Sequence, residues 1–238
     1  MRLTLIRHGQ TPSNVRGLLD TGAPGPGLTD LGTAQAEALP SQFGDAPVDA
    51  VYVSRLVRTH VTAAPLALAR DLERVELPGL HEVEAGSLEM RGDQASVRRY
   101  METAFSWGLG DLDQAMPDGP DGHEFFGRYD ADIERAVREA RHPVLVSHGA
   151  AIRIWVAARA TNILPEFTAH HHLPNAGVVE LEGTPETGWR LLRWPDAEIP
   201  ADDPDPIDTE IDVVDGDPRV TESRAPAHSA RDGSRLPT

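Results

Sequence analysis

A short apolar run near the start of the chain, Leu3 to Ile6, stops abruptly at the Arg-His-Gly sequence of residues 7–9. Apolar runs of this length without polar alternation are typical of strands buried on both faces. Thr11 and Pro12 come next, and they are typical of the cap and the first residue of a helix. Because open α/β proteins bind ligands at the carboxyl ends of their strands, the sequence predicts a ligand site at residues 7–9.

Two further apolar runs end close to residues that can bind an anion. Val48 to Val53 is followed within a few positions by Arg58, and Pro143 to Ser147 is followed directly by His148. A shorter strand is expected at Val75 to Leu77. Strands that alternate with helices predict a mostly parallel central sheet flanked by helices, which is a three-layer α/β sandwich. Since parallel strands share one carboxyl edge, Arg58 and His148 are expected to lie near the Arg-His-Gly sequence.

The segments between these strands carry helical spacing and helix-start signals. A helix capped by Thr29 is predicted from Leu28 to about Phe43, and another from about Leu56 is predicted to bend near Pro65. The remaining expected elements are helices at residues 94–107, 124–141 and 150–160, and an edge hairpin formed by Val178–Leu181 and Trp189–Arg193.

Composition excludes several classes of function. The 238 residues include no cysteine, which removes disulfides and a cysteine-based phosphatase nucleophile. All 22 basic residues are arginine, so a P-loop lysine and a Schiff-base lysine are excluded as well. The net charge of −16 argues against a nucleic-acid partner, and no apolar run is long enough for a membrane span. With no signal-peptide pattern near its start, the chain is expected to be cytoplasmic.

The composition changes beyond Pro195. Residues 196–238 hold 12 acidic residues against 4 arginines, contain many prolines and no aromatic residue, and show no sustained periodicity. Such a segment cannot bury enough apolar surface to offset the entropy of ordering it. We therefore expect one domain at residues 1–195, followed by a disordered acidic tail at 196–238.

Two arginines and two histidines around one point describe a site for a dianion such as a phosphoryl group, because an arginine fork binds phosphate with two parallel hydrogen bonds. The motifs that hold these residues resemble those of the histidine phosphatase superfamily, which has the phosphoglycerate-mutase-like fold. They occur in the family's order over about residues 3–181. The motifs are Arg7-His8-Gly9-Gln10-Thr11 with Asn14; Leu28-Thr29 with Gly32 and Gln35-Ala36; Ser54, Leu56, Arg58-Thr59, Thr62-Ala63 and Pro65; Leu80, Glu82 and Gly86; Val146-Ser147-His148-Gly149 with Ile152-Arg153; and Asn175-Ala176.

The resemblance implies a role for each matching residue. It implies that His8 is the nucleophile, forming a phosphohistidine, and that Glu82 is the general acid that protonates the leaving alcohol. The phosphoryl oxygens are expected to be held by Arg7, Arg58 and His148, and the substrate to be contacted by Asn14, Gln10, Thr11 and Gly149. Nearby arginines favour the neutral imidazole that attack requires and offset the charge of the transition state, so the scheme needs no metal or cofactor.

The resemblance also implies a helical cap over the site at about residues 83–142. Arg98 and Arg99 lie on the expected cap helix, where they either bind a second anionic group of the substrate or face solvent. Glu84 and Glu89 are alternatives to Glu82 as the acid, although the motif spacing favours Glu82.

Two candidates lie outside the cap. Arg16, in the first loop, has the same two readings as Arg98 and Arg99. His170 to His172 resembles a metal tract, but without an adjacent carboxylate or helical spacing it is interpreted as a sheet-edge loop.

The chain departs from the family pattern in the substrate-facing region. Glu89 to Gly92 interposes two residues where members often have an acidic residue directly before glycine, and Gly122 to Glu124 replaces the frequent Gly-Glu-Ser. The sequence thus predicts a phosphatase of a small phosphomonoester without naming the ester. One alternative is a cofactor-dependent phosphoglycerate mutase, disfavoured because only 66 positions separate Glu82 from His148. The other is a non-catalytic binding module, disfavoured because the catalytic set is complete.

Overall fold

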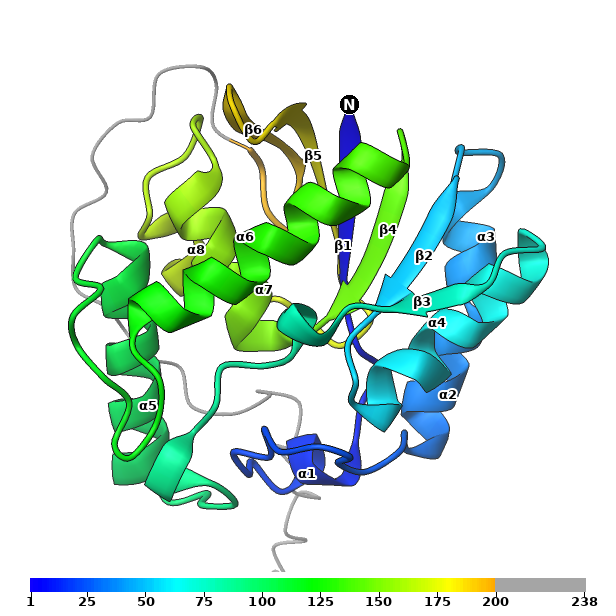
Figure 1. Cartoon of the computed structure of the whole chain (residues 1–238). Coiled ribbons are helices and arrows are strands. Elements are labelled where there is room, and N and C mark those ends of the chain that lie inside the picture. The colour runs from blue at the N-terminus through cyan, green and yellow to red at the C-terminus, as the bar shows by residue number, and fades with distance from the viewer. Residues whose placement is uncertain (200–238) are drawn as a thin grey trace, which may run out of the picture.

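The computed structural model describes residues 1–199 of the chain. Within that part, six strands form one sheet in the order β3-β2-β4-β1-β5-β6 (Figure 1). The strands are β1 Arg2–Arg7, β2 Ala50–Val53, β3 Arg74–Glu76, β4 Pro143–Ser147, β5 Val178–Thr184 and β6 Gly188–Arg193.

The four strands β1 to β4 run parallel, and β5 and β6 form an antiparallel hairpin at one edge. The register pairs Arg7 with Ser147 and Val53 with Val146, so β1, β2 and β4 end at nearly the same level. His8 and His148 therefore leave the sheet side by side. The predicted parallel sheet and edge hairpin are confirmed.

Helices cover both faces of this sheet and make three layers, as predicted (Figure 1). One layer holds α2 Asp30–Glu37, α3 Leu39–Phe43 and α4 Val57–Ala69. The other holds α5 Gln94–Gly108, α6 Gly122–Glu139, α7 Gly149–Arg159 and α8 Phe167–His170. A one-turn helix, α1 Pro12–Val15, follows β1, and two 3-10 turns lie at Pro78–Leu80 and Gly86–Leu88.

The apolar core is divided by the sheet into two clusters. Alternate residues of one strand face opposite layers: Leu145 of β4 belongs to the larger cluster, whereas Val144 and Val146 belong to the smaller one. The predicted cap region supplies much of the larger cluster, in which Phe125 stacks on Trp107 at 5.8 Å and on Tyr129 at 5.5 Å between ring centroids.

The predicted helix at 28–43 is wrong as a single element, because the structure divides it into α2 and α3 at Ala38. Pro40 explains the break, since its ring clashes with the preceding turn and it has no backbone N–H to donate. Pro65, in contrast, lies inside α4, which continues to Ala69. The helix predicted from Glu124 begins earlier, at Gly122, because Asp121 forms a capping box with Glu124.

The described chain continues past the predicted domain boundary at residue 195. Trp194 is buried and bridges to Ala197, and both Ala197 and Ile199 pack against the larger core cluster. The rest of the predicted tail, residues 200–238, lies outside the described residues. None of the helices in residues 1–199 is long and apolar enough to cross a membrane.

Gly32, at the start of α2, lets the helix approach the turn after His8. Thr29 donates from its backbone to the Gln10 carbonyl oxygen at 2.9 Å, and the Gln10 N–H donates to Gln35 Oε1 at 2.9 Å. A Cβ at residue 32 would meet the Gln10 carbonyl oxygen and lie 2.8 Å from its nitrogen. Only glycine fits this contact without a shift of the backbone.

We expect Gly32→Ala to destabilise the domain by about 1–3 kcal/mol, as overpacking against backbone does. Thermal unfolding measures the effect. Gly127→Ala is the matched control, because Gly127 lies exposed in α6 with open space around its Cα. There alanine is expected to stabilise by about 0.4–1 kcal/mol. Equal melting temperatures for the two variants would contradict the contact argued for Gly32.

Candidate active site

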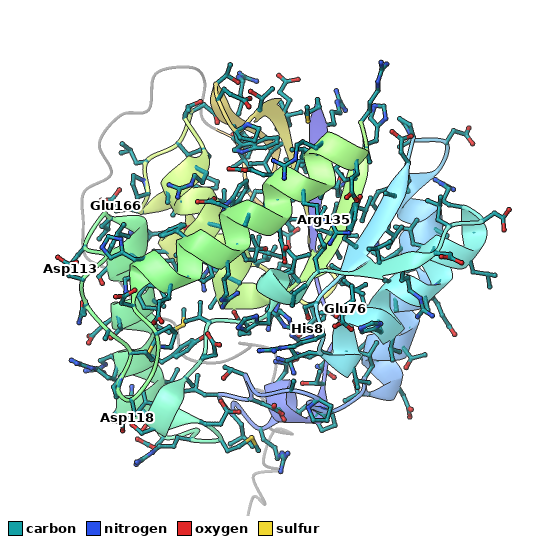
Figure 2. The ribbon with its side chains drawn as sticks, in the orientation of Figure 1. His8, Glu76, Asp113, Asp118, Arg135 and Glu166 are labelled. Carbon is teal, nitrogen blue, oxygen red and sulfur yellow. The ribbon has the colours of Figure 1, made fainter. Side chains whose placement is uncertain are left out.

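A small pocket of about 80 Å³ lies at the carboxyl ends of the parallel strands, beside α1. Figure 2 shows His8 between the lower end of β1 and that helix. The pocket is lined by Arg7, His8, Thr11, Ser13, Asn14, Leu18, Leu19, Asp20, Thr21, Arg58, Glu82, Tyr100 and Gly149. It thus brings together residues from β1, the first loop, α4, α5, α7 and the segment after Leu80.

The His8 ring is oriented by the backbone of the residue that follows it. Its Nδ1 lies 2.7 Å from the Gly9 carbonyl oxygen, which can only accept, so Nδ1 carries the proton. The lone pair of the neutral ring is therefore on Nε2. His8 is only 4% exposed. Burial lowers its pKa well below the ordinary value, and the charges of Arg58 and Arg7 lower it further. The ring is thus held neutral, as a nucleophile must be.

Two guanidinium groups face this imidazole. Arg7 donates from Nη1 to the Leu173 carbonyl oxygen at 2.6 Å, and it passes close to Gly149, where a Cβ would lie 3.1 Å from Arg7 Nε. Arg58 is 3% exposed and donates from Nη2 to the Asp20 carbonyl oxygen at 2.9 Å. Within the described residues, Nε and Nη1 of Arg58 have no hydrogen-bond partner. Buried donors without a partner fit a bound anion.

His148 stands beside His8, with the ring centroids 5.3 Å apart. Its Nε2 lies 2.8 Å from the Ser54 hydroxyl, whereas its buried Nδ1 has no hydrogen-bond partner in the described part of the chain. Burial lowers the pKa of His148 well below the ordinary value, with Arg58 and His8 adding to the effect. Ser54 thus fixes one side of the ring and leaves the other for a ligand.

Glu82 lines the pocket and is hydrogen-bonded to the start of α7. Its carboxylate accepts hydrogen bonds from the backbone N–H groups of Ala151 at 2.8 Å, Ala150 at 3.2 Å and Val83 at 2.9 Å. The N–H groups of Ala150 and Ala151 belong to the first turn of α7, where backbone donors have no acceptor within the helix. Glu82 therefore caps α7 from another segment of the chain. The carboxyl group is thereby fixed at the pocket.

The two alternative acids are bound elsewhere and do not line the pocket. Glu84 accepts from His81 Nε2 at 2.7 Å and from Arg128 Nη2 at 3.4 Å. Burial raises the pKa of Glu84, but His81 and Arg128 together outweigh it and lower that pKa below its ordinary value. Glu89 accepts from the backbone N–H of Thr21 at 2.9 Å. Of the three glutamates considered as the acid, Glu82 is therefore the one whose side chain lines the pocket.

The other residues predicted to contact the substrate differ in where they lie. Asn14, Thr11 and Gly149 line the pocket. Gln10 does not, because its side chain accepts from the Thr29 hydroxyl at 2.9 Å and so belongs to the contact with α2. Arg98, Arg99 and Arg16 are all exposed, and none of them lines the pocket.

Several residues around the site were not predicted from the sequence, and three of them bear on its chemistry. Asp20 and Tyr100 line the pocket, and the Tyr100 hydroxyl donates to the Val83 carbonyl oxygen at 2.9 Å. Arg128 braces the segment that holds Glu82: it donates to the carbonyl oxygens of Gly79, His81 and Glu82 at 2.5, 2.8 and 2.8 Å. Its position on the apolar face of α6, three residues after Phe125, was an available signal.

The His170–His172 tract lies away from this pocket. His170 ends α8, and His171 stacks on Phe167 with centroids 4.1 Å apart while its Nδ1 donates to the Phe167 carbonyl oxygen at 2.8 Å. No cluster of three or more His, Asp or Glu side chains in residues 1–199 is arranged to hold a metal ion.

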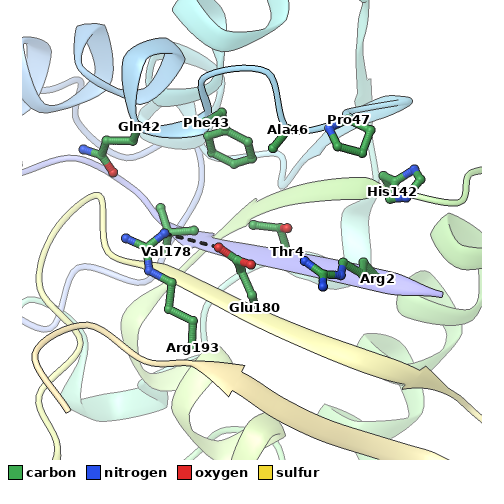
Figure 3. Close-up of a pocket in the computed structure, with 10 residues that line it drawn as sticks. All are labelled: Arg2, Thr4, Gln42, Phe43, Ala46, Pro47, His142, Val178, Glu180 and Arg193. Atoms are coloured by element: carbon green, nitrogen blue, oxygen red, sulfur yellow. Dashed lines mark hydrogen bonds and ion pairs between the residues drawn. The ribbon is translucent and has the colours of Figure 1, made fainter. Parts of the chain in front are cut away.

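A second pocket of similar size lies between α3 and the amino-terminal half of β1 (Figure 3). Arg2, Thr4 and Phe43 line it, and Arg193 there pairs with Glu180 at 3.2 Å. None of the residues predicted to do chemistry lines this pocket. The candidate site is therefore the pocket that contains His8.

A sheet whose parallel strands end in two neutral imidazoles and two guanidinium groups is typical of a class of protein that binds and transfers phosphoryl groups. The family model of the histidine phosphatase superfamily, branch 1, matches residues 3–197. The chain belongs to this superfamily, and it is an enzyme of the phosphatase type.

Three relatives match between 68% and 81% of the chain, and two of them are phosphatases by name. PE_PGRS11, a PE-PGRS family protein of Mycobacterium tuberculosis, is 34% identical over 81% of the chain, although the match spans only 36% of that relative. Adenosylcobalamin/alpha-ribazole phosphatase of Salmonella typhimurium is 34% identical over 68% of the chain and 80% of the relative. Among solved structures, a mycobacterial glucosyl-3-phosphoglycerate phosphatase in complex with VO3 is 25% identical, with a TM-score of 0.67 over 81% of this chain and 98% of the other.

We expect His8 to be neutral and protonated on Nδ1 at pH 6.5 and for some distance below it, because burial and the two arginines lower its pKa. Two-dimensional ¹H–¹⁵N NMR of the imidazole nitrogens measures both the tautomer and the titration, and the His8→Gln spectrum assigns the signals. A His8 ring half-protonated near pH 6.5, or protonated on Nε2, would contradict the assignment of the nucleophilic nitrogen.

Proposed function

We propose that the chain hydrolyses phosphomonoesters of small metabolites through a covalent phosphohistidine on His8. The observation that carries the proposal is the neutral His8 ring, whose Nε2 bears the lone pair and which shares one pocket with Arg7 and Arg58. The histidine phosphatase family and the phosphatase relatives support the reaction class.

In the first step, the phosphoryl group is bound by Arg7, Arg58 and the Nδ1 side of His148. Nε2 of His8 attacks phosphorus, and the bond from phosphorus to the ester oxygen breaks. Protonated Glu82 gives its proton to that oxygen, so the alcohol leaves neutral. Two guanidinium groups offset the negative charge that the transition state spreads over the phosphoryl oxygens, and the scheme uses no metal ion.

In the second step, the Glu82 carboxylate accepts a proton from water as the oxygen of that water attacks phosphorus. The phosphorus–nitrogen bond breaks and inorganic phosphate is released, which returns His8 to its neutral form and Glu82 to its protonated form. The backbone donors of Ala150 and Ala151 keep the Glu82 carboxyl group in place through both steps.

The domain organisation belongs to the same proposal. Residues 83–142 act as a helical cap over the pocket, which is supported by Tyr100 of α5 among the lining residues. The packing of Ala197 and Ile199 supports a domain boundary slightly beyond residue 195, with the acidic tail following it. The cytoplasmic location expected from the sequence stays a prediction.

His8→Ala is expected to lower kcat by a factor on the order of 10³ or more, because the nucleophile is removed. Phosphate release from a panel of phosphorylated metabolites measures it. Rapid quench with a ³²P-labelled ester should give an acid-labile, base-stable phosphoprotein in the unaltered enzyme and none in the variant. His123→Ala is the control, since His123 is an exposed histidine on α6. A His8→Ala protein that keeps more than a few per cent of activity would rule out the covalent mechanism.

Glu82→Gln is expected to slow the phosphorylation step in proportion to the basicity of the leaving group. For an alkyl phosphate the loss should be on the order of 10² to 10⁴, because a strongly basic alkoxide needs the proton. For p-nitrophenyl phosphate the loss should be much smaller, because the phenolate departs unaided. Single-turnover kinetics separate this step from hydrolysis of the phosphohistidine.

Glu134→Gln is the suitable control for that experiment, since Glu134 forms an exposed ion pair with Arg138 and does not line the pocket of His8. Glu84→Gln is not equivalent, because Glu84 contacts Arg128, which braces Glu82. Equal losses for both leaving groups would mean that Glu82 positions the substrate and is not the acid.

A further inference from the structure

The pocket contains one carboxylate that the proposed mechanism does not use. Asp20 lines the pocket, and its side chain is only 12% exposed. The Ser13 hydroxyl donates to Asp20 Oδ2 at 2.5 Å, and Oδ1 lies 3.9 Å from Nη1 of Arg58. The carboxylate is therefore fixed at the wall of the pocket beside one of the two cations.

The loop that carries Asp20 is tied to the segment after Gly86. Leu19 exchanges backbone hydrogen bonds with residues 90–91, and the Glu89 carboxylate accepts from the backbone N–H of Thr21 at 2.9 Å. These contacts use the residues by which the chain departs from the family pattern. A loop held in this way fixes the negative charge of Asp20 in the pocket.

Among residues 1–199, the lining holds no cation beyond those that bind the phosphoryl group. Arg7 and Arg58 are the two cationic residues that line the pocket, and the phosphoryl dianion uses both. Arg128 is turned toward backbone carbonyl oxygens and Glu84, and Arg98 and Arg99 are exposed outside the lining.

We propose that Asp20 is a specificity-determining residue, which restricts this pocket to monophosphate esters whose alcohol portion is uncharged or cationic. With the phosphoryl charge matched by the two arginines, Asp20 adds a further negative charge to the wall of the pocket. A carboxylate on the substrate would lie near this like charge with no cation to pair with it, which weakens binding and transition-state stabilisation alike. The inference rests on the proposed phosphatase function, and it separates this chain from enzymes that act on phosphoglycerate.

The test uses two esters with the same three-carbon skeleton. In sn-glycerol 3-phosphate a hydroxymethyl group stands where 3-phosphoglycerate has a carboxylate, and both release a primary alkoxide from phosphorus. The unaltered enzyme should have the higher kcat/KM for glycerol 3-phosphate. In Asp20→Asn, which keeps an oxygen to accept from Ser13, the ratio of kcat/KM for 3-phosphoglycerate to that for glycerol 3-phosphate should rise about tenfold. The enhancement should shrink at high ionic strength.

Asp30→Asn is the matched control, because it removes the same charge from an exposed position in the first turn of α2. Its substrate ratio should equal that of the unaltered enzyme. An unchanged ratio in Asp20→Asn overturns the inference, and so does a preference of the unaltered enzyme for 3-phosphoglycerate, which needs no variant to observe. Failure of the unaltered enzyme to release phosphate from either ester and from p-nitrophenyl phosphate would instead overturn the proposed function.

Discussion

The site depends on keeping two buried imidazoles neutral next to two guanidinium groups. The hydrogen bond from His8 Nδ1 to the Gly9 carbonyl oxygen selects the tautomer, while burial and the charge of Arg58 and Arg7 oppose a second proton. The register of β1 against β4 brings His148 to the same place, since Arg7 pairs with Ser147. Backbone geometry therefore sets the position and the tautomer of the nucleophile, whereas burial and the two arginines keep it neutral.

Two carboxyl groups, those of Glu82 and Asp20, line the same pocket as Arg7 and Arg58. Glu82 is fixed by the first turn of α7 and by Arg128, which holds the backbone on both sides of it, so its carboxyl group faces the pocket. Asp20 is fixed by Ser13 and by its loop, and it lies beside Arg58. One carboxyl group can exchange a proton with the substrate, whereas the other supplies a fixed charge. In the proposed scheme, Glu82 thus takes part in the reaction, and Asp20 acts on which substrates bind.

Much of the fold and the catalytic core could be predicted from the sequence, because the apolar strands and the residues at their ends are adjacent in the chain. The break at Ala38 was not predicted, because the helical periodicity continues across it and only Pro40 indicates that the helix is interrupted. Asp20 could not be predicted as a pocket residue, since its place depends on contacts between its loop and residues 89–91, far away in sequence. Motif spacing likewise cannot show that Arg98 and Arg99 face solvent while the next residue, Tyr100, lines the pocket.

The features that make His8 a nucleophile also lower the stability of the fold in acid. The pKa values of His8 and His148 are lowered in the native state, whereas the unfolded chain binds protons at the ordinary histidine pKa of about 6.5. As the pH falls below that value, the two histidines bind protons in the unfolded state but stay neutral in the native state. The free energy of unfolding therefore decreases. Above it, both states leave the rings neutral and no such loss occurs. A bound phosphoryl dianion opposes this effect, because it offsets the arginine charges that hold the two rings neutral and so favours their protonated forms.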